Sequence, residues 1–412
     1  MDFATRAQTA AAAMRALFDP TPLQRNAFLS ERFGCDLWLK REDLSPVRSY
    51  KIRGAFNAMG KAIAEGADAF VCASAGNHAQ GVAYVARHYG VRAVIFMPVT
   101  TPRQKIDKTQ VFGGDAVEIR LTGDYFDDTL AAAQAHCATT GARFLSPFDD
   151  ADVIVGQASV AVELLEQMKT VPDLIVLPVG GGGLSSGMRA YLSDTAPETE
   201  MVLVEPEGGA SLTAALDAGA PVTLNRVDTF VDGAAVGRIG EKTFEILRDV
   251  APADVLLAPE NRICTTIVEM LNHEGIVLEP AGALSLDILP QIRDRLAGRQ
   301  VVAVTSGGNF DFERLPEVKE RAQRYSGVKK YMILRLPQRP GALRDFLEML
   351  GPDDDIARFE YLKKSARNFG SVLIGIETRD AANFDRLFRS LEDGGFVYRD
   401  ITDDDTLAEF VI

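Results

Sequence analysis

The chain has 412 residues, 47% of them hydrophobic and 25% charged, so it exceeds a single hydrophobic core and has the composition of a folded protein. Its formal net charge of −14 repels nucleic-acid backbones and anionic lipid surfaces, so we expect neither as a partner. The four cysteines lack the spacing of metal ligands or of a redox pair, which indicates thiols in a reducing compartment and no metal site.

The N-terminal segment, residues 1 to 19, is rich in alanine but lacks the uninterrupted apolar core of a signal peptide. We expect an amphipathic helix there. No later run approaches the roughly 18 apolar residues of a membrane span. The sequence therefore predicts a cytoplasmic protein.

Short apolar runs alternate with amphipathic stretches from about residue 36 to residue 305. Continuous Val, Ile and Leu runs are typical of strands buried on both faces, and helices between them imply parallel crossovers. The pattern predicts an α/β fold. The expected strands are Cys35–Leu39, Ala69–Ala73, Ala93–Pro98, Leu174–Val179, Met201–Val204 and Val301–Thr305.

Lys51 is the first candidate for chemistry. A helical pattern begins at this residue and Ser49 is the expected N-cap, so the ammonium group would lie near the positive end of a helix dipole. The dipole and the nearby Arg53 would lower the pKa of the lysine, which favours the free amine that Schiff-base chemistry needs. The alternative is a solvated surface lysine.

Glycine-rich turns follow three of the expected strands, at the strand ends where parallel sheets bind ligands. In the first turn the Asn77 amide is expected to face a ring hydroxyl, or else to cap the next helix. The same turn is expected to hold a carboxylate through Ser74, Ala75, Gly76, Asn77 and His78. His78 has no partners that would suggest a hydrolase triad, so we assign it a supporting role.

The second turn holds four consecutive glycines, Gly180, Gly181, Gly182 and Gly183, followed by Leu184. Without Cβ atoms, the N–H groups of such a turn converge on an anion at a helix N-terminus, so the segment predicts a phosphate site. The alternative is a flexible linker. In the third turn Ser306 either ends its strand or offers a neutral hydroxyl to a pyridine nitrogen.

After residue 324 the pattern changes to a β-α-β-β-α-β order, with a boundary expected near Tyr325 to Gly327. About 85 residues are enough for a small separate domain. The expected elements are strands at Lys329–Leu336, Ile356–Lys363, Ser371–Glu377 and Val397–Ile401, and helices at Pro340–Leu350 and Asn383–Glu392.

Taken together, the motifs resemble the threonine dehydratase family of fold-type II pyridoxal-phosphate enzymes over nearly the whole chain. The matching motifs are Thr21-Pro22-Leu23, Lys40-Arg41-Glu42-Asp43-Leu44, Ser49-Tyr50-Lys51-Ile52-Arg53-Gly54-Ala55, Ser74 to Gly81, Gly180 to Leu184, Glu279-Pro280-Ala281-Gly282-Ala283 and Ser306-Gly307-Gly308-Asn309. The resemblance implies that Lys51 carries pyridoxal 5′-phosphate as a Schiff base. It also implies that Asn77 meets the ring hydroxyl, Gly180 to Leu184 bind the phosphate and Ser306 meets the ring nitrogen.

The resemblance further implies two open parallel-sheet lobes over residues 1–326, with a small lobe at about 45–150, and an α+β ACT-like regulatory domain over 327–412. The regulatory likeness lies mainly in Arg335-Leu336-Pro337, Arg339-Pro340-Gly341-Ala342-Leu343 and Leu391-Glu392-Asp393-Gly394-Gly395-Phe396. Isoleucine would bind there and inhibit, valine would oppose it, and the assembly would be a homotetramer. The alternative is a domain that only assembles subunits.

The implied reaction converts L-threonine to 2-oxobutanoate and ammonia, the first step of isoleucine synthesis, with Lys51 removing the Cα proton. The rivals are a serine dehydratase or serine racemase of the same fold, since L-serine differs by one methyl group, and a non-catalytic amino-acid sensor. A racemase of this family would hold a divalent metal after the strand that ends at Glu205. Here Glu205, Gly209 and Ser211 offer a single carboxylate.

Overall fold

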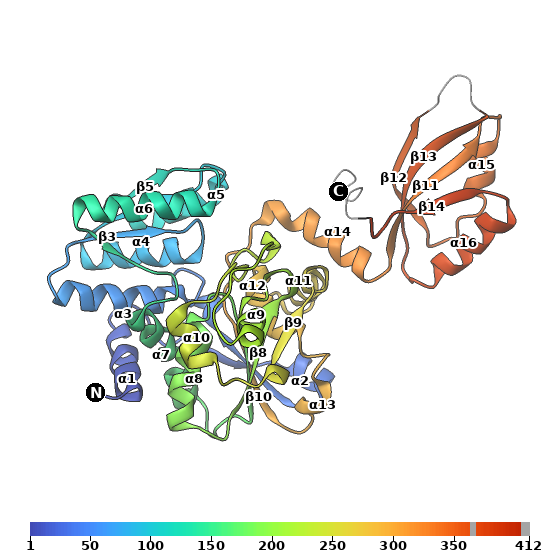
Figure 1. Ribbon diagram of the computed structural model, residues 1–412. Helices are drawn as coiled ribbons and strands as arrows, with labels where there is room; N and C mark the ends of the chain where they lie inside the picture. Colours follow the sequence, from blue (N-terminus) through green and yellow to red (C-terminus); the bar gives the residue numbers. More distant parts are fainter. Residues whose placement is uncertain (363–367, 405–412) are drawn as a thin grey trace. The chain divides into compact units, whose positions relative to one another are not determined.

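The computed structural model describes residues 1–362 and 368–404, and it divides into two compact units, Met1–Asp311 and Phe312–Ile412 (Figure 1). The first unit has two sheets and the second has one, and no sheet or core cluster is shared between the units. In the described residues no helix is long and apolar enough to cross a membrane. The elements of the first unit place the candidate site.

The larger sheet of the first unit has the strand order β1-β2-β10-β7-β8-β9. All neighbours pair in parallel except β1, which pairs with β2 in the antiparallel sense at one edge. This edge is the one departure from the expected parallel sheet. The strands are β1 Leu23–Arg25, β2 Asp36–Arg41, β7 Leu174–Pro178, β8 Glu200–Pro206, β9 Val255–Ala258 and β10 Gln300–Thr305.

The smaller sheet has the order β5-β4-β3-β6 and is parallel throughout. Its strands are β3 Ala69–Ala73, β4 Arg92–Met97, β5 Val117–Leu121 and β6 Arg143–Phe144. The helices that alternate with them are α3 Lys51–Ala64, α4 Asn77–Tyr89, α5 Arg103–Gly113 and α6 Phe126–Thr140. All these elements lie inside the range of about 45–150 expected for the small lobe (Figure 1).

Helix α7 (Ala151–Gln167) lies between the two lobes and packs on α3, α8 and α1. The Asp150 carboxylate caps it by accepting hydrogen bonds from Asp152 N at 2.8 Å and Val153 N at 3.0 Å. Its residues are buried from Val153 to Leu164, as expected for a helix with packing on several sides. The other helices of this unit are α1 Phe3–Met14, α2 Ala27–Phe33, α8 Gly183–Thr195, α9 Ser211–Ala218, α10 Glu241–Leu247, α11 Glu260–Glu274, α12 Pro280–Asp287 and α13 Arg293–Leu296.

The second unit has one antiparallel sheet of order β12-β13-β11-β14 with α15 and α16 packed on one face. Its core includes Met332, Leu334, Phe346, Ile374 and Leu387. The β-α-β-β-α-β order is as predicted, although Lys363 of the expected third element lies outside the described residues. The elements are α14 Leu315–Tyr325, β11 Lys329–Pro337, α15 Ala342–Leu347, β12 Asp355–Leu362, β13 Phe369–Glu377, α16 Asn383–Asp393 and β14 Val397–Asp400.

Candidate active site

Lys51 is the first residue of α3, and its Nζ donates a hydrogen bond of 3.0 Å to the carbonyl oxygen of Pro147. Burial lowers the pKa of the lysine to about 8, and the Glu279 carboxylate opposes the shift. The predicted direction is therefore right. Arg53 contributes nothing to it, contrary to expectation, because its guanidinium lies among buried carboxylates.

Ser49 is not the N-cap of α3, so this prediction is wrong. The N-cap is Tyr50, which makes no side-chain capping bond. Ser49 instead forms an isolated antiparallel bridge with Gly307, and Tyr50 N donates to Ser306 O at 3.1 Å. The bridge holds the start of α3 directly against the third glycine-rich turn.

The segment Pro147 to Phe148 connects Lys51 with the glycine turn of the second motif. Pro147 accepts from Lys51, and the Phe148 ring packs where a Cβ on Gly181 would stand, 2.2 Å from Phe148 Cδ1. A Cβ on Gly180 would lie 2.9 Å from Ala234 Cα. Side chains are therefore excluded from this turn by close neighbours on two sides.

The same turn leads into α8, which begins at Gly183. Gly182 has a φ of 87°, which L-residues rarely adopt. Among the residues that the structure describes, the N–H groups of Gly181 to Leu184 have no acceptor. A bare turn with unpaired donors at a helix N-terminus fits a phosphate group, and these residues would hold that of the cofactor.

Asn77 is the first residue of α4, and its amide does not cap the helix, whose N-cap is Gly76. Asn77 Nδ2 donates to Glu279 Oε1 at 2.6 Å, and Asn77 Oδ1 accepts from Asn309 Nδ2 at 2.6 Å. A Cβ on Gly307 would lie 3.4 Å from Asn77 Nδ2. The fold thus brings the first and third glycine-rich turns together.

Sequence reasoning missed Glu279 as a site residue, although it lies in one of the matching motifs. Its side chain is buried between Asn77 and Gly307, and burial, with Asp232, raises the pKa of Glu279 to about 7. The available signal was its position before Pro280, where α12 begins. Its partner Asn77 lies 202 positions away in the sequence.

The remaining turn residues lie in the same region. Ser306 follows β10, is 2% exposed, and donates to Ala281 O at 3.2 Å. Ser74 Oγ accepts from Gly76 N at 3.2 Å, with Ala75 between them. His78 Nε2 lies 3.1 Å from Leu145 O, and burial, with the Lys51 charge, lowers the pKa of His78 to about 3. The His78 ring is therefore neutral at physiological pH.

Glu205, near the end of β8, accepts hydrogen bonds from the first turn of α9. Its carboxylate accepts from Leu212 N at 2.6 Å, and from Thr213 N at 2.9 Å and Thr213 Oγ1 at 2.7 Å. Within residues 1–362 and 368–404 no group of three or more His, Cys, Asp or Glu residues could hold a metal ion.

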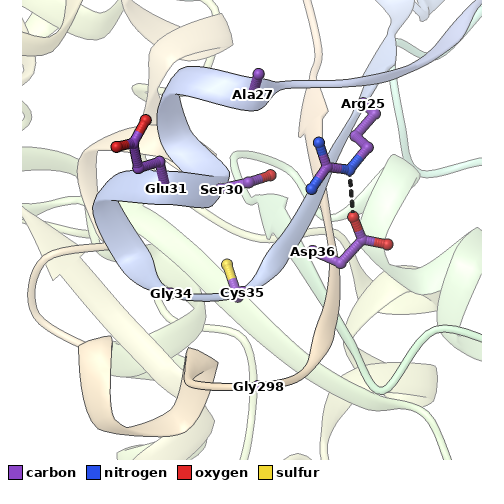
Figure 2. Close-up of a pocket in the computed structure, with 8 residues that line it drawn as sticks. All are labelled: Arg25, Ala27, Ser30, Glu31, Gly34, Cys35, Asp36 and Gly298. Carbon is purple, nitrogen blue, oxygen red and sulfur yellow. Dashed lines mark hydrogen bonds and ion pairs between the residues drawn. The ribbon is translucent and has the colours of Figure 1, made fainter.

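A separate surface hollow of about 550 Å³ lies around α2 and the start of β2 (Figure 2). An Arg25–Asp36 ion pair of 2.5 Å spans part of it. The lining residues are Arg25, Ala27, Ser30, Glu31, Gly34, Cys35, Asp36 and Gly298. None of them belongs to the site around Lys51.

Comparison with known proteins gives two family matches. Residues 14–307 match the family described as pyridoxal-phosphate dependent enzyme, and residues 320–411 match the C-terminal regulatory domain of threonine dehydratase. The chain is 48% identical to the L-threonine dehydratase biosynthetic IlvA of Bacillus subtilis over 394 residues, which is 95% of this chain and 93% of that protein.

Solved structures are also similar to this chain, and the following are two of them. Threonine deaminase isoform 2 from Solanum lycopersicum has a TM-score of 0.72 and 35% identity, covering 77% of this chain and 88% of its own. Maize serine racemase has a TM-score of 0.70 and 25% identity, covering 78% and 98%. The predicted fold class is confirmed by these matches.

Proposed function

The chain belongs to the family of pyridoxal-phosphate-dependent enzymes, and from that premise we propose which of its residues convert L-threonine to 2-oxobutanoate and ammonia. The activity itself, threonine ammonia-lyase, follows from the 48% identity over 95% of the chain and from the regulatory domain. The observation that carries the residue assignment is the contact of Lys51 Nζ with Pro147 O, beside the bare glycine turn against Phe148.

The site residues fit the cofactor. Lys51 would hold it covalently, Gly180 to Leu184 would bind its phosphate, Asn77 would meet its ring hydroxyl and Ser306 its ring nitrogen. When bound, pyridoxal phosphate withdraws electrons from the substrate and so acidifies the proton on Cα.

The chain's own groups then have defined tasks. The turn from Ser74 to His78 holds the substrate carboxylate and orients the Cα proton toward Lys51. The Lys51 amine removes that proton, since a pKa of about 8 leaves part of the amine uncharged near neutral pH. In the balanced reaction the Cα proton and the β-hydroxyl leave together as water, and the resulting enamine takes up another water to give the oxoacid and ammonia. Neutral His78 supports the turn without titrating.

An assay of oxoacid release with threonine and with serine tests the substrate. Threonine should be the better substrate, and a serine preference would favour the rival dehydratase. Lys51→Ala should abolish both the activity and the long-wavelength absorption of the bound cofactor. Lys61→Ala on the same helix is the control, since Lys61 only pairs with Asp152 at the surface. Retained absorption in Lys51→Ala would refute the role of the lysine.

A serine racemase remains the second candidate because maize serine racemase shares the fold and one methyl group is worth only about 1 to 3 kcal/mol of discrimination. The capping bonds of Glu205 to α9 argue against the racemase metal site. The test is whether L-serine gives D-serine, and whether a chelator removes any such activity.

Regulation forms the second part of the proposal. We propose that isoleucine binds the second unit and inhibits, that valine opposes it, and that the enzyme is a cytoplasmic homotetramer supplying isoleucine synthesis. The match of residues 320–411 to a regulatory domain supports effector binding. Repeating the threonine assay with isoleucine, with valine and with both tests it, and light scattering gives the subunit number.

The domain division at residues 326 and 327, with a small lobe at about 45–150, also stays a prediction. Along the chain, the division between the two compact units falls between Asp311 and Phe312, which assigns α14 to the second unit. Limited proteolysis would locate the exposed connection and decide between the two boundaries.

A further inference from the structure

A row of polar side chains crosses the site and joins Lys108 of α5 to Glu279. Lys108 Nζ donates to Asn309 Oδ1. Asn309 Nδ2 donates to Asn77 Oδ1 at 2.6 Å and also to Val47 O at 2.8 Å. Asn77 Nδ2 then donates to Glu279 Oε1 at 2.6 Å. The row connects a helix of the small lobe with the turn after β10.

The direction of every bond in the row is fixed by its ends. An ammonium group only donates, so Lys108 must face the oxygen of the Asn309 amide, and the Val47 carbonyl only accepts, so it must face the nitrogen. Because the orientation of the Asn309 amide is fixed, its Nδ2 must face an acceptor on Asn77, and that acceptor is Oδ1. Asn77 Nδ2 is therefore turned to the side of Glu279 and Gly307.

Asn77 Nδ2 carries two hydrogens, and the bond to Glu279 uses one. Among the described residues the second hydrogen has no acceptor. Because the Lys108 charge polarises both amides along the row, this free N–H is a stronger donor than an isolated amide.

We propose that Lys108 is a positioning residue which, through Asn309, fixes the orientation of the Asn77 amide and so aims an N–H at the ring hydroxyl of the cofactor. The inference rests on the proposed role of Asn77. Lys108 Nζ bonds to the Asn309 amide, so its effect passes through the two amides.

Lys105 offers a matched control. It lies three residues earlier on α5, is likewise partly buried and bridges to the large lobe, but it pairs with Asp232 and is outside the row. A residue that only fastens α5 to the large lobe would give the same result at either position. A residue that orients Asn77 gives an effect at Lys108 alone.

The test is the dissociation constant of pyridoxal phosphate, measured by absorption during titration of the full chain. Lys108→Met should weaken cofactor binding about tenfold, as expected for the loss of a charge-assisted hydrogen bond. Lys105→Met should weaken it less than about threefold. Equal effects at both positions, or an unchanged constant in Lys108→Met, would overturn the proposal.

Two further variants test the route through Asn309. Asn309→Asp keeps an acceptor for Lys108 but has no N–H for Asn77 or for Val47 O, so cofactor binding should fall about tenfold. In Asn309→Ala, adding Lys108→Met should cause no further loss. Losses that multiply in the double variant would show that Lys108 acts independently of Asn309 and would overturn the route.

Failure of the proposed function looks different. If the unaltered chain bound no pyridoxal phosphate, or if Asn77→Ala bound it with unchanged affinity, the role of Asn77 itself would be wrong. If Asn77→Ala weakens binding and Lys108→Met does not, only the positioning role of Lys108 fails.

Discussion

The side chains of Lys51 and Arg53, two residues apart in the first turn of α3, reach opposite surroundings. Lys51 Nζ contacts Pro147 O in the site, whereas the Arg53 guanidinium is fully buried and bonds to both Glu42 and Glu163 at 2.7 Å. The first turn of this helix is thus anchored by Arg53 on one side and presents Lys51 to the candidate site on the other. The low pKa of the lysine follows from burial and not from its cationic neighbour.

The pKa of about 8 predicts how covalent loading of the cofactor depends on pH. Only the free amine reacts with an aldehyde, so the loading rate should rise about tenfold from pH 7 to pH 9 and then level off. Stopped-flow absorption after mixing the full chain with pyridoxal phosphate measures it. A rate still climbing steeply above pH 9 would indicate an ordinary lysine.

Glu163→Gln should destabilise the first unit by about 3 kcal/mol, because it leaves buried cations short of a partner. Burial alone would raise the pKa of Glu163, but Arg53 and Lys40 hold it well below its usual range. Urea unfolding followed by fluorescence gives the change. Glu166→Gln, exposed on the same helix, is the control and should shift stability by less than about 0.5 kcal/mol.

The same depressed pKa fixes the sign of a pH effect. The ionised form of Glu163 is favoured in the folded state, so its contribution is present at neutral pH and is lost as the pH falls below the unfolded value. The unaltered chain should therefore lose stability between about pH 5 and pH 3 more steeply than Glu163→Gln. Parallel acid unfolding curves for the two proteins would contradict this.

Gly181→Ala should weaken pyridoxal phosphate binding by at least about tenfold, since the new Cβ would stand 2.2 Å from the Phe148 ring and displace one wall of the turn. Absorption titration measures the dissociation constant. The control is Gly237→Ala, whose Cβ would make an ordinary contact of 3.5 Å with Val227. Normal cofactor binding in Gly181→Ala would remove this turn from the phosphate site.

Ser306→Asp should increase side reactions relative to elimination. A neutral hydroxyl leaves the ring nitrogen of the cofactor largely unprotonated, whereas a carboxylate would hold a proton there and prolong negative charge on Cα. Chromatography of the keto-acid and cofactor products gives the ratio. Ser306→Asn, neutral and similar in size, is the control, and equal product ratios in the two variants would count against the idea.

Much of the fold could be predicted because its strands are continuous apolar runs. Ala69–Ala73 was predicted without error, and β7, β8 and β10 differ from prediction by at most two residues at an end. Sequence reasoning missed all four edge strands of the first unit's two sheets, β1, β5, β6 and β9. β1 has three residues and β6 has two, and so short a segment carries no periodicity.

The site was predictable where local motifs define it and unpredictable where distant segments meet. Because glycine-rich turns follow the strands, the sequence predicted that Asn77, Gly180 to Leu184 and Ser306 lie in the same region. The Glu279 contact with Asn77 joins residues 202 positions apart, and the Ser49 bridge to Gly307 replaces the expected cap. No local pattern encodes such pairs, since they arise only when the sheet is assembled.

The position of β10 between β2 and β7 has a consequence for synthesis of the protein. Lys51 leaves the ribosome early, but Ser306 and Gly307, which bond to the adjacent Tyr50 and Ser49, are translated some 250 residues later, after seven other strands and β10 itself. A nascent chain therefore contains Lys51 long before it contains the strand end that would face pyridoxal phosphate. Capture of the coenzyme must follow translation of nearly the entire first unit.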